Sequence, residues 1–221
     1  MPRKNNPEET VERILSASMK IFYEKGFDKT SMQDIVDASD MSKGAIFYHF
    51  KSKEEVFEAA MEKRAAQMRE ILLGWLDEMK GQSAREKLIS LIRRNIVSRE
   101  MVSPEEVSAM VGLSPHLLMS NMRNNIAKST PLLAGIIQEG IEDGSFTLVP
   151  FPDECAEVFM LLFNFWCDPH IFTCDMPAVK KRLLFLQHLM KQLGVDIVTD
   201  EIIDLLMDLL ENFYREVRKH G

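Results

Sequence analysis

The stretch TSMQDIVDASDMSKGAIFYHFKSKEE, Thr30 to Glu55, decides the fold of this 221-residue chain. Ser31 with Asp34 three residues later is typical of a capped helix start, and Ser42 is typical of a second one. The intervening Ser39-Asp40-Met41 predicts a tight turn. Two short helices joined in this way form a helix-turn-helix, whose second helix enters the major groove of DNA, although helical hairpins also occur in proteins that bind no DNA.

The second of these helices, SKGAIFYHF, has two different faces. Ile46 and Phe50 stand four residues apart and therefore point to the same side, toward a small apolar core. The opposite face combines small, cationic and aromatic groups, which allow a close approach to a nucleic acid. Its members are Lys43, Gly44, Ala45, Phe47, Tyr48 and His49.

Both flanks of this stretch resemble the tetracycline-repressor family. ERILSASMKIFYEKGFDKTSMQDI resembles its amino-terminal signature, and SKGAIFYHFKSKEEVF resembles its recognition helix and the start of its fourth helix. Asp40 replaces the usual turn glycine, and Asp tolerates a left-handed backbone. Phe47 replaces a usual tyrosine, which leaves Tyr48 as the better hydroxyl donor. The positions that match the family are Gly26, Thr30, Ile35, Gly44, His49, Phe50, Lys53 and Glu54.

The resemblance implies an all-α, homodimeric transcriptional regulator, of repressor type, that binds a palindromic DNA operator and is released by a small, largely apolar effector. It implies a three-helix DNA-binding domain at 1–51 and a helical effector-binding and dimerisation domain at 52–221, joined by a long helix at about 52–80. No cofactor is implied. The expected DNA contacts are Thr30, Ser31, Gln33, Ser42, Lys43, Gly44, Ala45, Phe47, Tyr48, His49 and Lys53.

Composition and charge are compatible with this interpretation. The chain is 46% hydrophobic and 28% charged, as in soluble globular proteins, and its net charge is −7. Residues 1–53 nevertheless hold nine Lys or Arg against eight Asp or Glu, so the acidity belongs to the remainder. No apolar run is long enough for a membrane span, and residues 1–6 lack the apolar core of a secretion signal. We therefore expect a cytoplasmic protein with no membrane partner.

Helical spacing and capping residues predict helices along the whole chain. The first begins at Pro7 and ends at Gly26, and the long helix begins at Ser52. Further on, Ser or Thr caps and first-turn prolines mark the starts, including Thr130-Pro131. The expected helices lie at about 83–100, 104–112, 115–127, 131–142, 152–168, 177–193 and 200–219.

Methionines and aromatic residues predict where an effector would bind. Seven of the 15 methionines fall between Met61 and Met122, and methionine readjusts around apolar partners of different shape. Such a stripe is more often plain core, but the resemblance implies a cavity, and nearby amide and imidazole groups could orient a ligand. The expected lining is Met68, Leu72, Trp75, Met79, Leu91, Asn95, Met110, His116, Met119, Met122, Phe159, Phe163 and Trp166.

The resemblance also places a dimer interface on the helices at about 152–168 and 177–193, which would form a four-helix bundle with the second copy. The last apolar segment, Ile202 to Val217, would extend that interface or cover its own domain. The expected contacts are Val158, Leu161, Leu162, Phe165, Leu183, Leu186 and Met190.

Other functions remain as alternatives. A DNA-binding regulator without an effector would have a well-packed carboxy-terminal domain. Cys167, His170 and Cys174 have C-x2-H-x3-C spacing and could form a metal or redox sensor, but no second compact pair supports them and no metal site is assigned. An enzyme is disfavoured because HExxH, GxSxG and phosphate-cradling glycine loops are absent from the sequence.

Overall fold

The computed structural model describes residues 7–98, 115–167, 171–172 and 174–220, and regular structure in this part of the chain is helical, without strands. This confirms the predicted all-α class. The described residues form two compact units. The head unit contains those up to Met68 and those of the seventh helix up to Arg123, and the body unit contains the rest. No helix in the described ranges is both long and apolar enough to cross a membrane.

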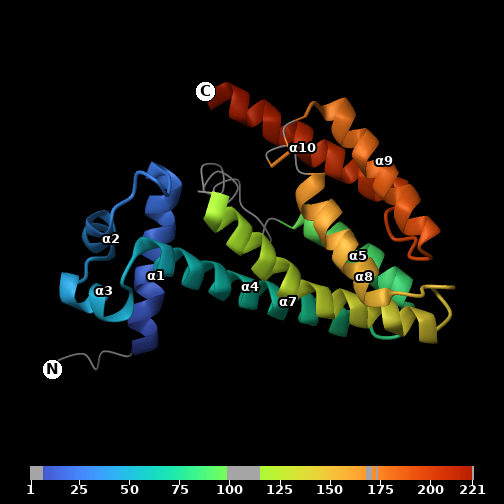
Figure 1. Ribbon diagram of the computed structural model, residues 1–221, viewed down its shortest axis with the longest axis horizontal. Helices are drawn as coiled ribbons and strands as arrows, with labels where there is room; N and C mark the ends of the chain where they lie inside the picture. The colour runs from blue at the N-terminus through green and yellow to red at the C-terminus, as the bar shows by residue number, and fades with distance from the viewer. Residues whose placement is uncertain (1–6, 99–114, 168–170, 173, 221) are drawn as a thin grey trace. The chain divides into compact units, whose positions relative to one another are not determined.

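The head unit is built on a small apolar core. The rings of Phe22, Phe27 and Phe57 pack with centroids 5.1 to 6.0 Å apart, and Ile35 and Ile46 are fully buried beside them. Aromatic packing of this kind fixes the angles between short helices. The helices are α1 (Pro7–Lys25), α2 (Met32–Ser39), α3 (Lys43–His49) and the first part of α4 (Lys53–Glu78) (Figure 1).

Local capping sets the ends of the head helices as the sequence predicted. Ser31 and Asp34 form a complete capping box at the start of α2. Asp40 ends the same helix in the left-handed region, with φ 53°, so the turn exists without glycine. Gly26 ends α1 with φ 83°. These residues hold α3 at a defined angle to α2.

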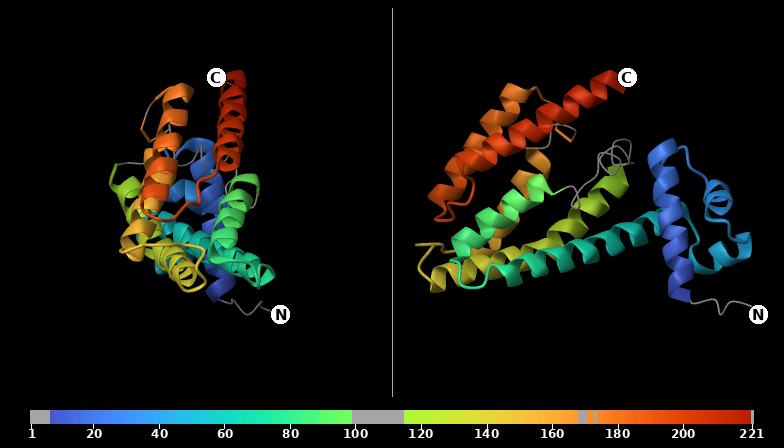
Figure 2. Two further views of the ribbon diagram at one scale, coloured as in Figure 1. Left: turned by 90° about the vertical axis from the view of Figure 1, so that its right-hand side faces the viewer. Right: turned by 180° about the vertical axis from the view of Figure 1, so that it is seen from behind.

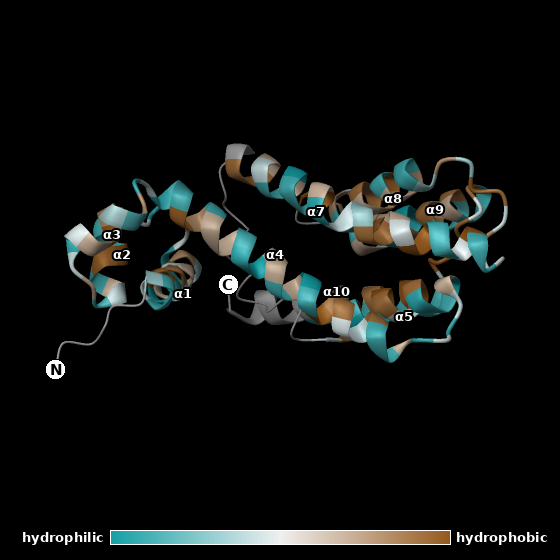
Figure 3. Cartoon of the chain, turned by 90° about the horizontal axis from the view of Figure 1, so that it is seen from below, coloured by the Kyte–Doolittle hydropathy of each residue, from teal (hydrophilic) through white to brown (hydrophobic). Residues whose placement is uncertain are grey.

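The body unit encloses a larger core. In it α10 packs against both α5 and α9, and Figure 2 shows α9 and α10 side by side. Hydrophobic bands recur among hydrophilic ones along these helices (Figure 3). The elements are α5 (Ala84–Val97), the later part of α7 (Pro115–Glu142), α8 (Pro152–Leu161), the π-helical turn η1 (Leu162–Trp166), α9 (Met176–Gln192) and α10 (Asp200–His220).

One glycine in the body unit is required by packing. A Cβ atom at Gly140 would lie 2.2 Å from the ring of Phe146, so only glycine lets this phenylalanine fold back onto α7. Phe146 is 3% exposed and belongs to the body core. The Phe146 ring therefore packs against the last turns of α7 before the chain continues toward α8.

Two predicted helix boundaries were wrong. Residues 115–142 form one helix that continues through Pro131, not two helices separated at Thr130. Proline removes the N–H that would donate to the carbonyl of Ala127, but both residues are exposed, so water can satisfy that oxygen. The helix expected at 152–168 changes from α to π geometry at Leu162. The helix expected at 104–112 lies outside the described residues.

Candidate nucleic-acid interface

Helix α3 presents a mixed face on the side opposite its core residue. Ile46 is fully buried, whereas Lys43, Gly44 and Tyr48 are exposed, Tyr48 to 79%. The ammonium group of Lys43 lies 5.7 Å from the centre of the Phe47 ring. The helix thus offers a cation, a residue without a side chain and an aromatic phenol to an approaching partner.

Gly44 is not needed by the fold. A Cβ atom built there meets no other atom within 4 Å, and Gly44 has no positive φ that would favour glycine. Glycine in a helix is less favourable than alanine by roughly 0.5 to 1 kcal/mol. Gly74 in α4 and Gly135 in α7 have the same free space, so the distinctive feature of Gly44 is its place on the exposed face of α3.

Helix α3 is only seven residues long, but both of its ends are hydrogen bonded. The Ser42 hydroxyl accepts from the amide of Ala45 at 3.2 Å, as predicted for a cap. At the other end, the Lys51 ammonium group donates to the carbonyl of Phe47 at 2.9 Å. These bonds satisfy backbone groups that a short helix leaves unpaired.

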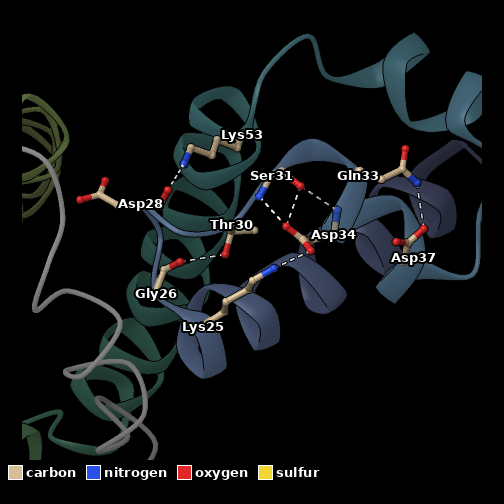
Figure 4. A network of polar contacts seen from close by, with 9 residues as sticks. All are labelled: Lys25, Gly26, Asp28, Thr30, Ser31, Gln33, Asp34, Asp37 and Lys53. Atoms are coloured by element: carbon tan, nitrogen blue, oxygen red, sulfur yellow. Dashed lines mark hydrogen bonds and ion pairs between the residues drawn. The ribbon is translucent and has the colours of Figure 1, made fainter.

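The structure corrects the role expected for Thr30. Its side chain is buried, 2% exposed, and its hydroxyl donates to the carbonyl of Gly26 at 2.8 Å (Figure 4). A buried hydroxyl cannot reach a phosphate, so the predicted contact through this side chain is wrong. Thr30 instead closes the connection between α1 and α2.

The amino terminus of α2 is already occupied by a carboxylate. Ser31 donates to Asp34 through both its hydroxyl, at 2.6 Å, and its amide, at 2.8 Å. Lys25 donates to the other oxygen of Asp34 at 2.6 Å, and this bond, with those from Ser31, holds the pKa of that carboxyl well below its usual range. The expected phosphate contact of Ser31 stays a prediction. Gln33 is exposed and donates to Asp37 at 2.9 Å.

Lys53 is engaged within the chain. Its ammonium group donates to the carbonyls of Phe27, at 2.8 Å, and Asp28, at 3.1 Å, and lies 4.6 Å from the centre of the Phe27 ring. Sequence reasoning missed these bonds because the partners are 25 and 26 residues earlier. His49 is partly buried, with its ring 5.0 Å from that of Tyr48.

The residues expected to line an effector pocket divide between the two units. Met79, Leu91 and Phe159 are buried in the body core, while Asn95 is exposed. Met110 and the side chain of His116 lie outside the described residues. Met68, Met119 and Met122 belong to the head unit, and Leu72, Trp75, Phe163 and Trp166 are partly buried against the body core.

Two hollows of the described residues lie in the head unit. One of them, about 390 Å³, is open to solvent between α1 and α4 in the head unit, and Leu15, Tyr23 and Arg64 line part of it. A second hollow beside it includes Val11 and His49. Neither contains a residue of the expected effector set.

The described part of the body unit contains one buried side-chain polar group without a hydrogen-bond partner. The Thr130 hydroxyl is buried and has no hydrogen-bond partner among the described residues. Leu133, Ala134 and Ile137 lie on the same face of α7 and belong to the body core. Sequence analysis used this threonine only as a helix cap and did not predict that its hydroxyl would be buried.

The expected dimer contacts need correction on α9. Leu183, Leu186 and Met190 are at most 1% exposed within their own chain, so they cannot be the contacts of a second copy. The exposed side of α9 has Leu184, at 45%, and Phe185, at 53%. The prediction chose the wrong face of α9 as the exposed one, because this helix has apolar residues on both faces.

The other residues expected at the dimer interface also differ in exposure. Leu161 is 42% exposed, Val158 and Leu162 are partly buried, and Phe165 is buried. In α10, Ile202 is fully buried and packs into the body core, so the start of this helix covers its own unit.

The cysteine cluster does not favour a metal. Burial raises the pKa of the Cys167 thiol to about 12, which keeps it protonated and weakens it as a ligand. Cys174 is partly buried, and His170 lies outside the described residues. Among the residues that the structure describes, no group of three potential ligands gathers.

This geometry defines a helix-turn-helix protein. The profile of bacterial regulatory proteins of the tetR family matches residues 14–60. Residues 14–60 are therefore similar to the DNA-binding part of the tetR family, in agreement with the resemblance seen in the sequence.

Relatives and solved structures extend the likeness along the chain. The HTH-type transcriptional regulator YwcC of Bacillus subtilis is 33% identical over 78 residues, covering 35% of this chain and 34% of that protein. The HTH-type transcriptional repressor KstR2 of Rhodococcus jostii is 26% identical over 148 residues, covering 60% and 66%. The chain thus spans about a third of the first and less than two thirds of the second.

A crystal structure of a TetR-family transcriptional regulator from Cytophaga hutchinsonii has the same fold. The TM-score is 0.57 over 93% of this chain and 95% of the other, at 17% identity. The two chains therefore share an all-helical fold.

Proposed function

We propose that this protein is a DNA-binding transcriptional regulator that acts as a repressor, binds a palindromic operator as a homodimer, and is released by a small, largely apolar molecule. The observation that carries the DNA-binding part is the outer face of α3. It combines the exposed Tyr48 and Lys43 with a glycine that the fold does not need. KstR2 is named a repressor, which supports the proposed sign of regulation.

The base-reading residues are Lys43, Gly44, Ala45 and Tyr48. Lys43 can donate to guanine or phosphate oxygens, the phenol of Tyr48 can donate to a base edge or a phosphate, and Gly44 lets the backbone approach the groove. Ser42, Phe47 and His49 flank them on the same helix. Ser31 and Gln33, at the exposed start of α2, would contact the adjacent backbone.

The proposed dimer face is the exposed apolar surface of α8 and α9 with Leu161, Leu184 and Phe185 at its centre. Each is between 42% and 53% exposed in the single chain. The ring of Phe185 packs edge-on against Trp166, with centroids 5.7 Å apart, so its position is fixed before association. Preorganised aromatic side chains are typical anchors of protein interfaces. A homodimer would place two copies of α3 on successive half-sites of an operator.

The proposed effector site is in the body unit. Trp75, Phe163 and Leu72 are partly buried against its core, and Phe159 and Phe163 stack with centroids 5.1 Å apart. A mainly apolar molecule that enters between such residues could bond its polar group to the Thr130 hydroxyl. Since α4 contributes Arg69–Glu78 to this unit and Lys53–Met68 to the head unit, its displacement is the proposed signal.

Selection of DNA from a random duplex library tests this function. The unmodified protein should enrich a palindrome, and Tyr48→Ala should weaken binding to the enriched duplex by about 1 to 3 kcal/mol. The unfolding curve should not change, since Tyr48 is outside the core. Enrichment of no sequence, or equal binding by Tyr48→Ala, would contradict the proposal.

A further inference from the structure

We propose that Lys53 is a positioning residue for DNA recognition: it ties the connection between α1 and α2 to the first turn of α4 and so holds α2 and α3 in the arrangement that reads an operator. This inference rests on the DNA-binding function proposed above. It assigns Lys53 a role different from the phosphate contact that its sequence position predicted.

The contacts of the ammonium group carry the inference. Lys53 donates to the carbonyl of Phe27 at 2.8 Å and to that of Asp28 at 3.1 Å, and Figure 4 shows the bond to Asp28. These carbonyls follow the end of α1, where backbone oxygens without helical partners attract cations. The ring of Phe27 lies 4.6 Å from the same ammonium group and is itself packed in the head core. Lys53 is therefore attached to a rigid part of the head.

The bonded carbonyl leads directly to the cap of α2. The oxygen of Phe27 also accepts from the amide of Thr30, at 3.1 Å. Thr30 donates its hydroxyl back to Gly26 and is followed by Ser31, the residue that caps α2. A shift of the ammonium group therefore disturbs a carbonyl shared with the residue that precedes the cap, and α2 in turn packs against α3.

A positioning residue and a phosphate contact differ in how their removal changes the salt dependence of DNA binding. Each phosphate contact releases condensed counterions, so removing one reduces the salt dependence of binding by about one charge. A residue that bonds only to carbonyls of its own chain leaves that slope unchanged. Two of the three ammonium protons of Lys53 are used inside the head.

The test compares three variants on two duplexes: one selected by the unmodified protein, and one of the same length with shuffled sequence. Lys53→Met removes the donors but keeps the stem, Lys53→Arg keeps the positive charge and N–H donors, and Lys43→Met is the control for a charge facing DNA. Binding is measured between about 50 and 200 mM salt. Amide exchange of Thr30 and Ser31 is measured in the free proteins.

Lys53→Met should weaken binding to the selected duplex by at least about tenfold, with an unchanged salt slope and little effect on the shuffled duplex. It should also speed amide exchange at Thr30 and Ser31. Lys53→Arg should restore both properties. Lys43→Met should lower the slope and weaken both duplexes, the selected one more, because Lys43 is also proposed to face base edges. If Lys53→Met does not fold, Lys53→Gln, which retains one amide donor group, takes its place.

Three outcomes would overturn the inference. A lower salt slope with equal loss on both duplexes would make Lys53 a phosphate contact. Unchanged binding, or unchanged exchange at Thr30, would remove the positioning role. If the unmodified protein selects no duplex, the proposed function itself fails, and that result is distinct because it does not involve the variants.

Discussion

The head and body units differ in the location of residues that packing within the unit does not explain. In the head, the buried hydroxyls of Ser18 and Thr30 donate to backbone carbonyls, and the unexplained residues, Gly44 and Tyr48, are on the surface. In the body, Gly74 and Gly135 are also glycines that the fold does not require, but the described part of this unit adds a buried hydroxyl without a hydrogen-bond partner, that of Thr130. This difference is why we propose that the head binds its partner at the outer surface of α3 and that the body binds an effector in its interior.

The largest expected effect concerns the surface of the body. Phe185→Asp should weaken dimerisation by about 100-fold or more, because it places a charge at the centre of the proposed interface. The monomer should stay folded, since Phe185 is 53% exposed. Sedimentation across a concentration series measures the change.

Two further variants control for this result. Phe151→Asp alters another exposed aromatic residue, about 15 Å along α8 from Leu161, and should leave the dimer intact. Leu186→Asp should unfold the body, since Leu186 is fully buried. A dimer that survives Phe185→Asp would place the interface elsewhere.

A smaller effect is expected inside the body. Thr130→Val replaces the hydroxyl with a methyl group of similar size and should raise the free energy of unfolding by about 1 kcal/mol, because an unpaired buried polar group is costly. Urea denaturation gives this value. Thr30→Val in the head is the matched control and should destabilise, because that hydroxyl is bonded. If Thr130→Val destabilises instead, the hydroxyl has a partner in solution.

The smallest effect is expected at the α2 cap and depends on pH. The pKa of Asp34 is lowered in the folded state, chiefly by the bond from Lys25 and then by those from Ser31. Its contribution to stability is therefore present above the unfolded pKa, near about 4, and is lost as the pH falls through the folded pKa. Asp34→Asn should be less stable at neutral pH.

Thermal melts at several pH values measure the stability difference between Asp34→Asn and the unmodified protein. That difference should shrink as the solution is acidified below about pH 4. A constant difference at all pH values would mean that the charge of Asp34 does not contribute.

The sequence was most informative where structure depends on neighbouring residues. The capping box of Ser31, the left-handed Asp40 and the glycine that ends α1 were all predicted from local chemistry, and the structure has them. The bonds of Lys53 could not be predicted in this way, because they join segments far apart in the chain.

Sequence patterns were less informative where a helix has apolar residues all around. In α9 the run from Leu183 to Leu186 is apolar throughout, so spacing alone does not identify which side is buried. Pro131 was predicted to start a helix. The helix continues through it because the carbonyl left without a donor is exposed to water, and this exposure depends on the tertiary structure. The predicted methionine stripe is divided between the two units. Composition alone does not specify which residues contact one another.

The central claim is that the outer face of α3 is shaped for DNA and not for the fold, and Gly44→Leu tests it most directly. We measure its free energy of unfolding and its affinity for the selected duplex on one preparation. Stability should be unchanged or higher by up to about 0.5 kcal/mol, because leucine is a better helix former and a Cβ there meets nothing within 4 Å. Affinity should fall by more than about tenfold. Unchanged affinity in the folded variant would contradict the claim.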